Sequence, residues 1–548
     1  MRVKKKRSRG EESCFDMLIL NGRVVDGTGN PWFRADIGIK AGRIVKIGSL
    51  ASASANKIID ARNLIVSPGF IDIHSHSDFA LIKDPKAESK IMQGVTTEVI
   101  GNCGLSTAPI RENTRGLLEK YLEPIRFKVK LNWFTIGEYL NQLEKQGIGL
   151  NVATLVGHGT IRIAVMGFDN RLPTKEELDD MKLLVSQSME DGAFGMSSGL
   201  IYPPGCYSNT RELIELCKVV GKYGGIYTTH IRDEEDALIE SVKEAIEIGK
   251  LSGIPVHISH HKAAGRANWG KVKETLNLMD EAREKGIDVT CDQYPYAASC
   301  TFLSTVIPIW AHEGGTGKLI ARLKDPEIRR RLAKEIEEGI PEWDKIMIVS
   351  VSSEKNKNFE GKTIAEISEA VGKNPADVTF DLLIEEEATV MAVFFEMCEE
   401  DVCTVMKHPV TMIGSDGLAV TPSGILGEVK QHPRSYGTFP RVLGKYVREE
   451  RVLTLEEAIR KMTSFPAQRL GFRDRGLIRE GFWADITIFD PSEIVDKATY
   501  TDPHQFPEGI KYVIVNGELV VEDGKHTGTL AGKVLRLNEA RTVADSHH

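Results

Sequence analysis

Six residues whose side chains bind metal ions follow apolar segments of the chain. His74 and His76 are two positions apart in SPGFIDIHSHSD, and residues i and i+2 of a strand point to the same side. The others lie in GNCG, YTTHIRD, VHISHHK and IGSDG, where they are Cys103, His230, His260 and Asp416. Imidazole and thiolate are preferred ligands of zinc, so the pattern predicts a Zn²⁺ site. Six ligands exceed the need of one tetrahedral ion, which leaves open two ions sharing Cys103, or one tight site with a weaker neighbour.

This set of side chains is suited to the hydrolysis of an amide bond. Zinc lowers the pKa of bound water to about 7 and polarises a carbonyl group. We expect Asp416 to act as general base toward the water and then as general acid toward the departing nitrogen.

Other histidines and one further cysteine are weaker candidates. His158 in GHGTIR is predicted either to contact the acyl oxygen or to orient a ligand from behind. His257 lies in mid-strand and is expected to be structural, and His261 to point away from its neighbour His260. His312 has no assigned role. Cys206 has no base partner that the sequence identifies, so we do not interpret it as a nucleophile.

The candidate ligands require strands that end together. Eight apolar segments alternate with charged helical stretches, and each ends in polar residues or glycine. They are residues 69–78, 96–104, 150–159, 193–200, 225–233, 255–265, 288–296 and 410–417. This alternation predicts an α/β fold with a (β/α)8 TIM-like barrel, whose active site lies at the carboxyl ends of the strands.

The flanking segments have a different pattern. Residues 17–66 and 468–535 contain short alternating strands with Asn-Gly turns, which predicts one small β-sandwich built from both chain ends. The barrel then spans 67–467. Residues 301–360 interrupt its rhythm with a charged helical insertion, interpreted as a lid over the pocket, with a surface ornament as the alternative.

The composition excludes several classes of protein. With 548 residues and a net charge of −8, the chain is large enough for two domains and lacks the basic character of nucleic-acid binders. We find no apolar run long enough for a membrane span. The eight scattered cysteines indicate free thiols and a cytoplasmic location. Residues 1–16 read as a flexible leader without a secretory signal, and 536–548 as a disordered tail. The oligomeric state is not readable.

Finer motifs resemble a known family over about residues 17–530. GNCG, GHGTIR, SSGLIYPPGCYS at 197–208 and HPRSYGTFPRVLG at 432–444 look like the D-aminoacylase (N-acyl-D-amino-acid deacylase) branch of the amidohydrolase superfamily. The resemblance implies zinc-dependent hydrolysis of N-acyl-D-amino acids to a carboxylate and a free D-amino acid. It also implies a tight zinc site made of Cys103, His230 and His260, and a weaker position lined by His74 and His76 with Asp416 close by.

The same resemblance implies a small substrate with a free carboxylate. Arg434, Lys262, Tyr294 and Tyr202 are the residues expected to hold it. A cyclic-amide hydrolase, such as a hydantoinase or dihydroorotase, is the first alternative, but it would bridge two metals with a carboxylated lysine where this chain has Cys103. A dipeptidase for D-residues stays open. A non-catalytic assembly protein is disfavoured because no ligand is missing.

Overall fold

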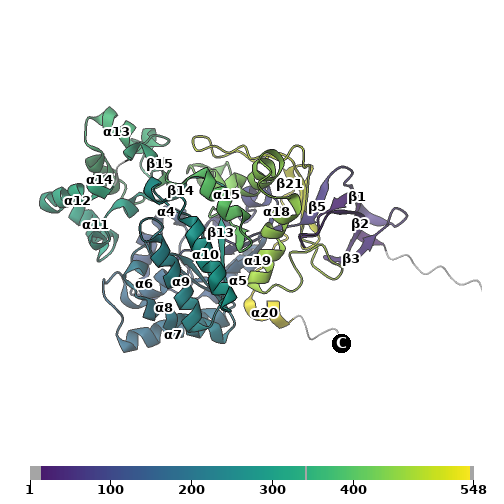
Figure 1. Cartoon of the computed structure of the whole chain (residues 1–548), viewed down its shortest axis with the longest axis horizontal. Coiled ribbons are helices and arrows are strands. Elements are labelled where there is room, and N and C mark those ends of the chain that lie inside the picture. The colour runs from purple at the N-terminus through teal and green to yellow at the C-terminus, as the bar shows by residue number, and fades with distance from the viewer. Residues whose placement is uncertain (1–13, 340–341, 543–548) are drawn as a thin grey trace, which may run out of the picture.

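The protein has a mixed α/β body with a separate sheet at one end. The computed structural model describes residues 14–339 and 342–542. Figure 1 shows strands β1, β2 and β3 at one end of the molecule and the helices α11–α14 at the other, with the α/β body between them. No helix in these two ranges is both long and apolar enough to cross a membrane.

All eight predicted segments of the body form strands. They are β6 (Phe70–Asp72), β7 (Val95–Ile100), β8 (Asn151–Thr154) continued by β9 (Val156–Gly157), β10 (Gly195–Gly199), β11 (Ile226–His230), β12 (Val256–Ile258), β13 (Val289–Gln293) and β17 (Thr411–Ile413). Their pairing is parallel throughout, in the orders β6-β7-β8 and β9-β10-β11-β12-β13-β17. Parallel pairing brings the carboxyl ends of neighbouring strands to one edge, as the motif positions require.

The first and last of these strands also meet. A parallel bridge joins Ser75 to Gly417. The Asp416 amide donates to the His74 carbonyl at 2.8 Å, and the His76 amide to the Gly417 carbonyl at 2.9 Å. Three candidate ligands are therefore tied together by backbone hydrogen bonds between segments that lie far apart in the sequence.

Helices follow the strands. The helices of the body are α5 (Ile136–Gln146), α6 (His158–Met166), α7 (Lys175–Glu190), α8 (Thr210–Lys222), α9 (Leu238–Ser252), α10 (Val272–Glu284), α15 (Glu399–Lys407), α17 (Arg434–Arg441), η7 (Val442–Glu449), α18 (Leu455–Met462) and α19 (Ser464–Leu470). Short helical turns lie in the loops, namely α1 (Ala80–Lys83), α2 (Glu88–Ile91), α3 (Arg115–Tyr121), α4 (Glu123–Arg126), η1 (Gly205–Tyr207), η2 (Arg266–Asn268) and α16 (Gly424–Gly427). Helix α7 begins with a capping box, in which Thr174 and Glu177 satisfy each other's backbone amides.

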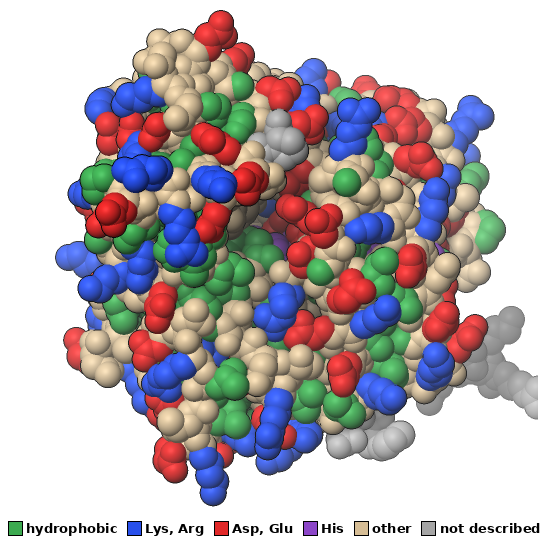
Figure 2. Space-filling view, turned by 60° about the vertical axis from the view of Figure 1, so that its left-hand side comes forward, with side chains coloured by type: hydrophobic (Ala, Val, Ile, Leu, Met, Phe, Trp, Pro, Cys, Tyr) green, Lys and Arg blue, Asp and Glu red, His purple; other side chains and the backbone are tan. Residues whose placement is uncertain are grey.

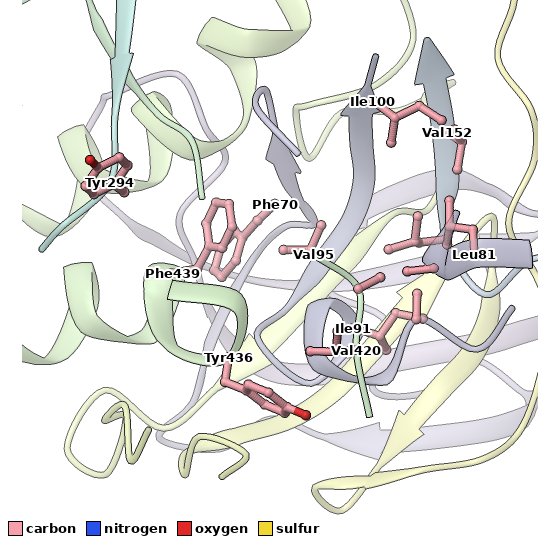
Figure 3. Packing of buried hydrophobic residues seen from close by; sticks show 14 of the residues in the cluster. Phe70, Leu81, Ile91, Val95, Ile100, Val152, Tyr294, Val420, Tyr436 and Phe439 are labelled. Carbon is pink, nitrogen blue, oxygen red and sulfur yellow. The ribbon is translucent and has the colours of Figure 1, made fainter. Parts of the chain in front are cut away.

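The core beneath the first strand also holds helix α17. Phe70 of β6 stacks on Phe439 of α17 with ring centroids 5.6 Å apart, and Val95 lies beside them (Figure 3). Burying side chains of this size stabilises the fold by roughly 1.5–3 kcal/mol each. This packing fixes α17, and with it Arg434 at its first turn, against the strand that leads to His74.

Strands from both chain ends build the separate sheet, as expected. They are β1 (Phe15–Val24), β2 (Phe33–Lys40), β3 (Arg43–Gly48), β4 (Ala55–Asp60), β5 (Ile65–Pro68), β18 (Ile486–Phe489), β19 (Ile510–Val515), β20 (Glu518–Glu522) and β21 (Lys525–His526). The two ends join where β5 pairs with β18 antiparallel. Strand β1 branches the sheet, since it pairs with β2, β4 and β5.

The structure corrects the two expected disordered ends. Strand β1 begins at Phe15, inside the predicted leader, and residues 1–13 lie outside the described residues. At the other end, helix α20 (Leu537–Thr542) replaces part of the predicted disordered tail, and 543–548 are not described. Leu537 is buried in the core, Ala540 packs against the same core, and the Leu537 amide donates to the Gly192 carbonyl. Burial of these apolar side chains holds the short helix against the body.

The insertion is longer and less helical than predicted. It contains β14 (Ser299–Phe302), β15 (Ile346–Ser350) and β16 (Met391–Phe394) with helices α11 (Thr316–Lys324), α12 (Pro326–Gly339), α13 (Ile364–Val371) and α14 (Pro375–Glu385), and the helical turns η3 (Leu303–Val306), η4 (Ile309–His312), η5 (Trp343–Lys345) and η6 (Glu354–Phe359). The strands form an antiparallel sheet in the order β14-β16-β15 above their own apolar core. Pairing between β14 and β16 joins the two ends of the insertion, and local periodicity carries no signal of such a long-range contact.

Candidate metal centre

Cys103 lies at the centre of the candidate ligands. It follows β7, and its Sγ is 3.3 Å from Nε2 of His74 and 3.4 Å from Nε2 of His260. The potential ligand atoms form two groups, each with all atoms within 4.8 Å of one another, namely His74, His76, Cys103 and Asp416, and Cys103, His230 and His260. Cys103 is therefore the residue common to both groups.

His230 is buried without a hydrogen bond to its ring. It ends β11, and neither Nδ1 nor Nε2 has a hydrogen-bond partner in the part of the chain that the structure describes. A buried polar group left unsatisfied costs about 1–3 kcal/mol, so such groups are rare in structures. An electron-pair acceptor beside this ring would satisfy its unprotonated nitrogen.

Three of the candidate ligands have unusual backbone conformations. The φ angles of Cys103, His260 and Asp416 are 51°, 35° and 49°. Non-glycine residues seldom occupy this left-handed region, and such strain is typical of functional sites. The three positions lie at the ends of different strands, so the strain is concentrated where the side chains converge.

The charge state of Cys103 is suited to a cation. Burial alone would raise the pKa of its thiol, but the imidazoles of His74 and His260 outweigh burial and hold the pKa well below its usual range. The thiolate is the form of cysteine that binds metals.

Asp416 contacts both candidate metal ligands and a candidate substrate-binding residue. Its Oδ1 lies 3.0 Å from Nε2 of His76 and 3.4 Å from Nε2 of His74, and its Oδ2 lies 2.7 Å from Nη1 of Arg434. Burial would raise the pKa of this carboxyl, but the Arg434 guanidinium and the neighbouring imidazoles hold it well below its usual range. The carboxylate is thus held in its ionised form.

The four residues expected at the substrate line the same cavity as the candidate ligands. The Tyr294 ring lies beside two cations, with Cζ of Arg434 4.8 Å and Nζ of Lys262 5.7 Å from its centroid. The Tyr202 hydroxyl hydrogen-bonds Thr301 of the insertion at 2.8 Å, and its ring meets the His230 ring edge-on at 5.1 Å.

One cavity of about 1100 Å³ joins these residues to the candidate ligands. Its walls include all four, together with His76, Cys103, His230, His260 and Asp416. The insertion adds further wall residues, among them Val306, Ile307, Pro308, Ile309 and Ile336. Figure 2 shows a hollow on this side of the molecule, with hydrophobic side chains in its depth and acidic side chains at its edge. The insertion therefore borders the cavity, where a lid would have to lie.

Sequence reasoning missed Asp292, which the structure places beneath the centre. Its Oδ2 accepts hydrogen bonds from Nδ1 of His74 at 3.1 Å and Nε2 of His257 at 2.8 Å, and its Oδ1 accepts one from the His260 amide at 3.0 Å. His257 is structural, as expected, but it supports the site through this carboxylate. The available signal was an acidic residue at the end of β13, in DQYPY.

Glu234 was also missed. It follows His230 by four residues, and its Oε1 lies 3.0 Å from Nδ1 of His260 and 2.6 Å from Nζ of Lys262. The signal was its place in THIRDE, directly after a strand end.

The weaker candidates lie outside the centre. Nε2 of His158 contacts Glu212 at 2.8 Å, and Nε2 of His261 contacts Thr275 of α10 at 2.8 Å, so the latter points away as predicted. His312 bonds the Ile307 carbonyl within the insertion. Burial raises the pKa of the Cys206 thiol to about 12, which is unsuited to a nucleophile.

The chain is similar to known proteins over most of its length. A sequence model described as the amidohydrolase family matches residues 57–521, and one described as the N-terminal domain of the urease alpha-subunit matches residues 1–70. The chain is 36% identical to a D-aminoacylase of Alcaligenes xylosoxydans xylosoxydans over 98% of this chain and all of that one. An N-acyl-D-aspartate deacylase of the same organism is 35% identical over 96% of each chain.

A solved structure is similar over the same extent. It is the N-acyl-D-glutamate deacylase of Bordetella bronchiseptica, complexed with zinc and a phosphonate mimic of the tetrahedral intermediate. Its identity is 35% and its TM-score 0.80, over 95% of this chain and all of that one.

Proposed function

Because the chain belongs to the amidohydrolase family, in its D-aminoacylase branch, we propose that it hydrolyses N-acyl-D-amino acids to a carboxylate and a free D-amino acid. The observation that carries the proposal is the shared position of Cys103, whose Sγ belongs to both groups of potential ligands. A thiol there differs from the carboxylated lysine expected of a cyclic-amide hydrolase. The relatives named for deacylation of N-acyl-D-amino acids cover nearly the whole chain.

The proposed architecture is a (β/α)8 barrel over residues 67–467. The cyclic order of the pairings supports it, since β8 continues into β9 and the Ser75–Gly417 bridge returns from β17 to β6. The sheet of both chain ends, 17–66 and 468–535, would be the small β-sandwich. The segment from β14 to β16 would be the lid inserted into the barrel.

The side chains fit zinc. Zinc prefers a donor set of this kind. Cys103 offers a thiol with a lowered pKa, His230 an imidazole without a hydrogen bond to either nitrogen, and Asp416 a carboxylate close to them. Cys103, His230 and His260 would hold the tight ion, and His74, His76 and Asp416 a weaker one that shares Cys103. When bound, zinc lowers the pKa of a water molecule to about 7 and polarises the scissile carbonyl.

The residues of the chain supply the remaining steps. Asp416 would accept a proton from the attacking water and deliver it to the leaving nitrogen, because its carboxylate lies beside the candidate metal ligands His74 and His76. Arg434 and Lys262 would hold the substrate carboxylate by charge-assisted hydrogen bonds, with the Tyr294 ring beside both of them. Tyr202, beside His230 on the cavity wall, would contact the same amino-acid part of the substrate.

A panel of N-acetyl-D- and N-acetyl-L-amino acids tests the function, with the zinc content measured on the same sample. We expect activity on D-forms, loss of activity with a chelator, and recovery with added Zn²⁺. Activity confined to L-forms would overturn the assignment to this branch but not the family. Activity on hydantoins or dihydroorotate with none on linear amides would favour the cyclic-amide alternative.

We also propose a cytoplasmic location for the enzyme. All eight cysteines are free thiols, and Cys103 must stay reduced to bind a metal.

A further inference from the structure

Glu234 contacts both the candidate zinc ligands and a candidate substrate-binding residue. It follows β11, and only 12% of its side chain is exposed. Its Oε1 lies 3.0 Å from Nδ1 of His260 and 2.6 Å from Nζ of Lys262, and its Oε2 lies 3.6 Å from Nε2 of His230. One carboxylate thus contacts two candidate zinc ligands and one candidate substrate residue.

The contacts allow one proton arrangement when His260 holds a metal. Its Nε2 faces the Cys103 sulfur at 3.4 Å, so this nitrogen must keep its electron pair for the ion. The proton is then on Nδ1, which donates to Glu234 Oε1, and the Lys262 ammonium donates to the same oxygen. Without Glu234, the Nδ1–H of His260 and the Lys262 ammonium, 2.8 Å apart, would be two donors facing each other.

Glu234 also determines where the Lys262 charge lies. Lys262 is nearly fully buried, and no other acidic side chain forms an ion pair with it among the described residues. An unpaired buried ammonium is costly, so the ion pair with Glu234 holds the Lys262 side chain in place beside Tyr294, on the cavity wall.

We propose that Glu234 is a positioning residue that couples the zinc site to the substrate-carboxylate site. It fixes the tautomer and ring orientation of His260, and it holds the Lys262 ammonium toward the cavity. The proposal rests on the proposed function for the identity of metal and substrate. It predicts that one substitution weakens both zinc binding and substrate binding, although Glu234 belongs to neither group of potential metal ligands.

The first test measures zinc affinity of the metal-free full chain by competition with a chelator. Carboxylates that support a metal-binding histidine contribute about 10–100-fold in affinity or activity. We expect Glu234→Gln to weaken zinc binding by that factor. Glu235→Gln is the matched control, because it removes a neighbouring exposed charge that has no contact with His260 or Lys262. Zinc affinity of Glu234→Gln equal to that of the wild type, in a folded protein, would overturn the proposal.

The second test separates KM from kcat in zinc-saturated enzyme. Lys262→Met is expected to raise KM while its zinc affinity stays within about twofold of the wild type. The double variant Glu234→Gln/Lys262→Met should show no further rise in KM over Lys262→Met, because contacting groups are coupled. Full additivity of the two KM effects would contradict the action of Glu234 through Lys262.

A second variant tests the proposal if Glu234→Gln does not fold. Glu234→Asp keeps the charge, but its side chain is too short to reach both His260 and Lys262, so it should weaken zinc binding and raise KM. Wild-type zinc affinity and KM in Glu234→Asp would refute the coupling. If the wild-type enzyme hydrolyses no N-acyl-D-amino acid, the proposed function fails, whereas the zinc affinities still test Glu234.

Discussion

Arg434 and Asp416 form a buried ion pair in which Nη1 and Oδ2 are 2.7 Å apart. Arg434 begins helix α17, and Asp416 follows β17. The pair joins the residue proposed to move the proton to a residue proposed to bind the substrate carboxylate. In the proposed mechanism, this one contact couples substrate binding to proton transfer.

Asp416→Asn should fold and keep the tight zinc while it loses turnover. The amide preserves the size of the side chain but cannot accept a proton, and general acid–base catalysis contributes about 10²–10⁴-fold. We expect kcat to fall by that factor while the tight zinc is retained, measured by steady-state kinetics and elemental analysis. Wild-type turnover of the variant would exclude the proton-transfer role.

Arg434→Lys should bind substrate poorly. Lysine keeps the charge but lacks the planar fork that matches a carboxylate. Loss of a hydrogen bond to a charged group costs about 1.5–3 kcal/mol, which corresponds to roughly a ten- to hundredfold rise in KM. The variant should show no such rise for an N-acyl amine without a carboxylate, and an equal rise for both substrates would argue against carboxylate recognition.

Cys103→Ser and His76→Ala should differ in zinc content. Cys103 belongs to both groups of potential ligands, whereas His76 belongs to one. The serine variant should lose zinc from both positions, and the His76 variant should retain the tight ion. Metal analysis after dialysis distinguishes them, and equal zinc content in the two variants would contradict a shared thiolate.

Glu396 should make KM depend on pH. Its carboxyl lines the cavity and accepts a hydrogen bond from Ser299 at 2.6 Å, and burial raises its pKa to about 7. Above pH 7 it becomes an additional negative charge and repels an anionic substrate. We expect the KM of the wild type to rise between pH 7 and 9, by about fivefold if the repulsion is on the order of 1 kcal/mol.

Glu396→Gln should remove this rise, whereas the exposed control Glu400→Gln should retain it. The free energy of unfolding should also fall as the pH rises. Because the folded pKa lies above the unfolded value, the stability that the neutral carboxyl contributes is complete at low pH and is lost as pH rises through 7. An identical pH profile for wild type and Glu396→Gln would refute the assignment.

The strands and their terminal residues were predictable because their signals are local. Alternation and apolar runs reflect side-chain direction within a few residues, so the eight segments and the positions of Cys103, His230 and His260 at their ends were visible in the sequence. The insertion was only partly predictable, since its sheet depends on pairing between β14 and β16.

The supporting residues were not predictable in this way. Asp292 and Glu234 are ordinary acidic residues in the sequence, and their roles follow from hydrogen bonds to His74, His260 and Lys262 on other strands.

The amino-acid sequence by itself determined which residue types stand at the end of each strand, because backbone geometry and hydrophobic periodicity act between near neighbours. Only the tertiary structure decided that Cys103 serves both groups of ligands and that Glu234 joins His260 to Lys262. Such contacts require strands far apart in the sequence to pair, and hydrogen bonds of a few ångströms form only after that pairing has placed their donors and acceptors.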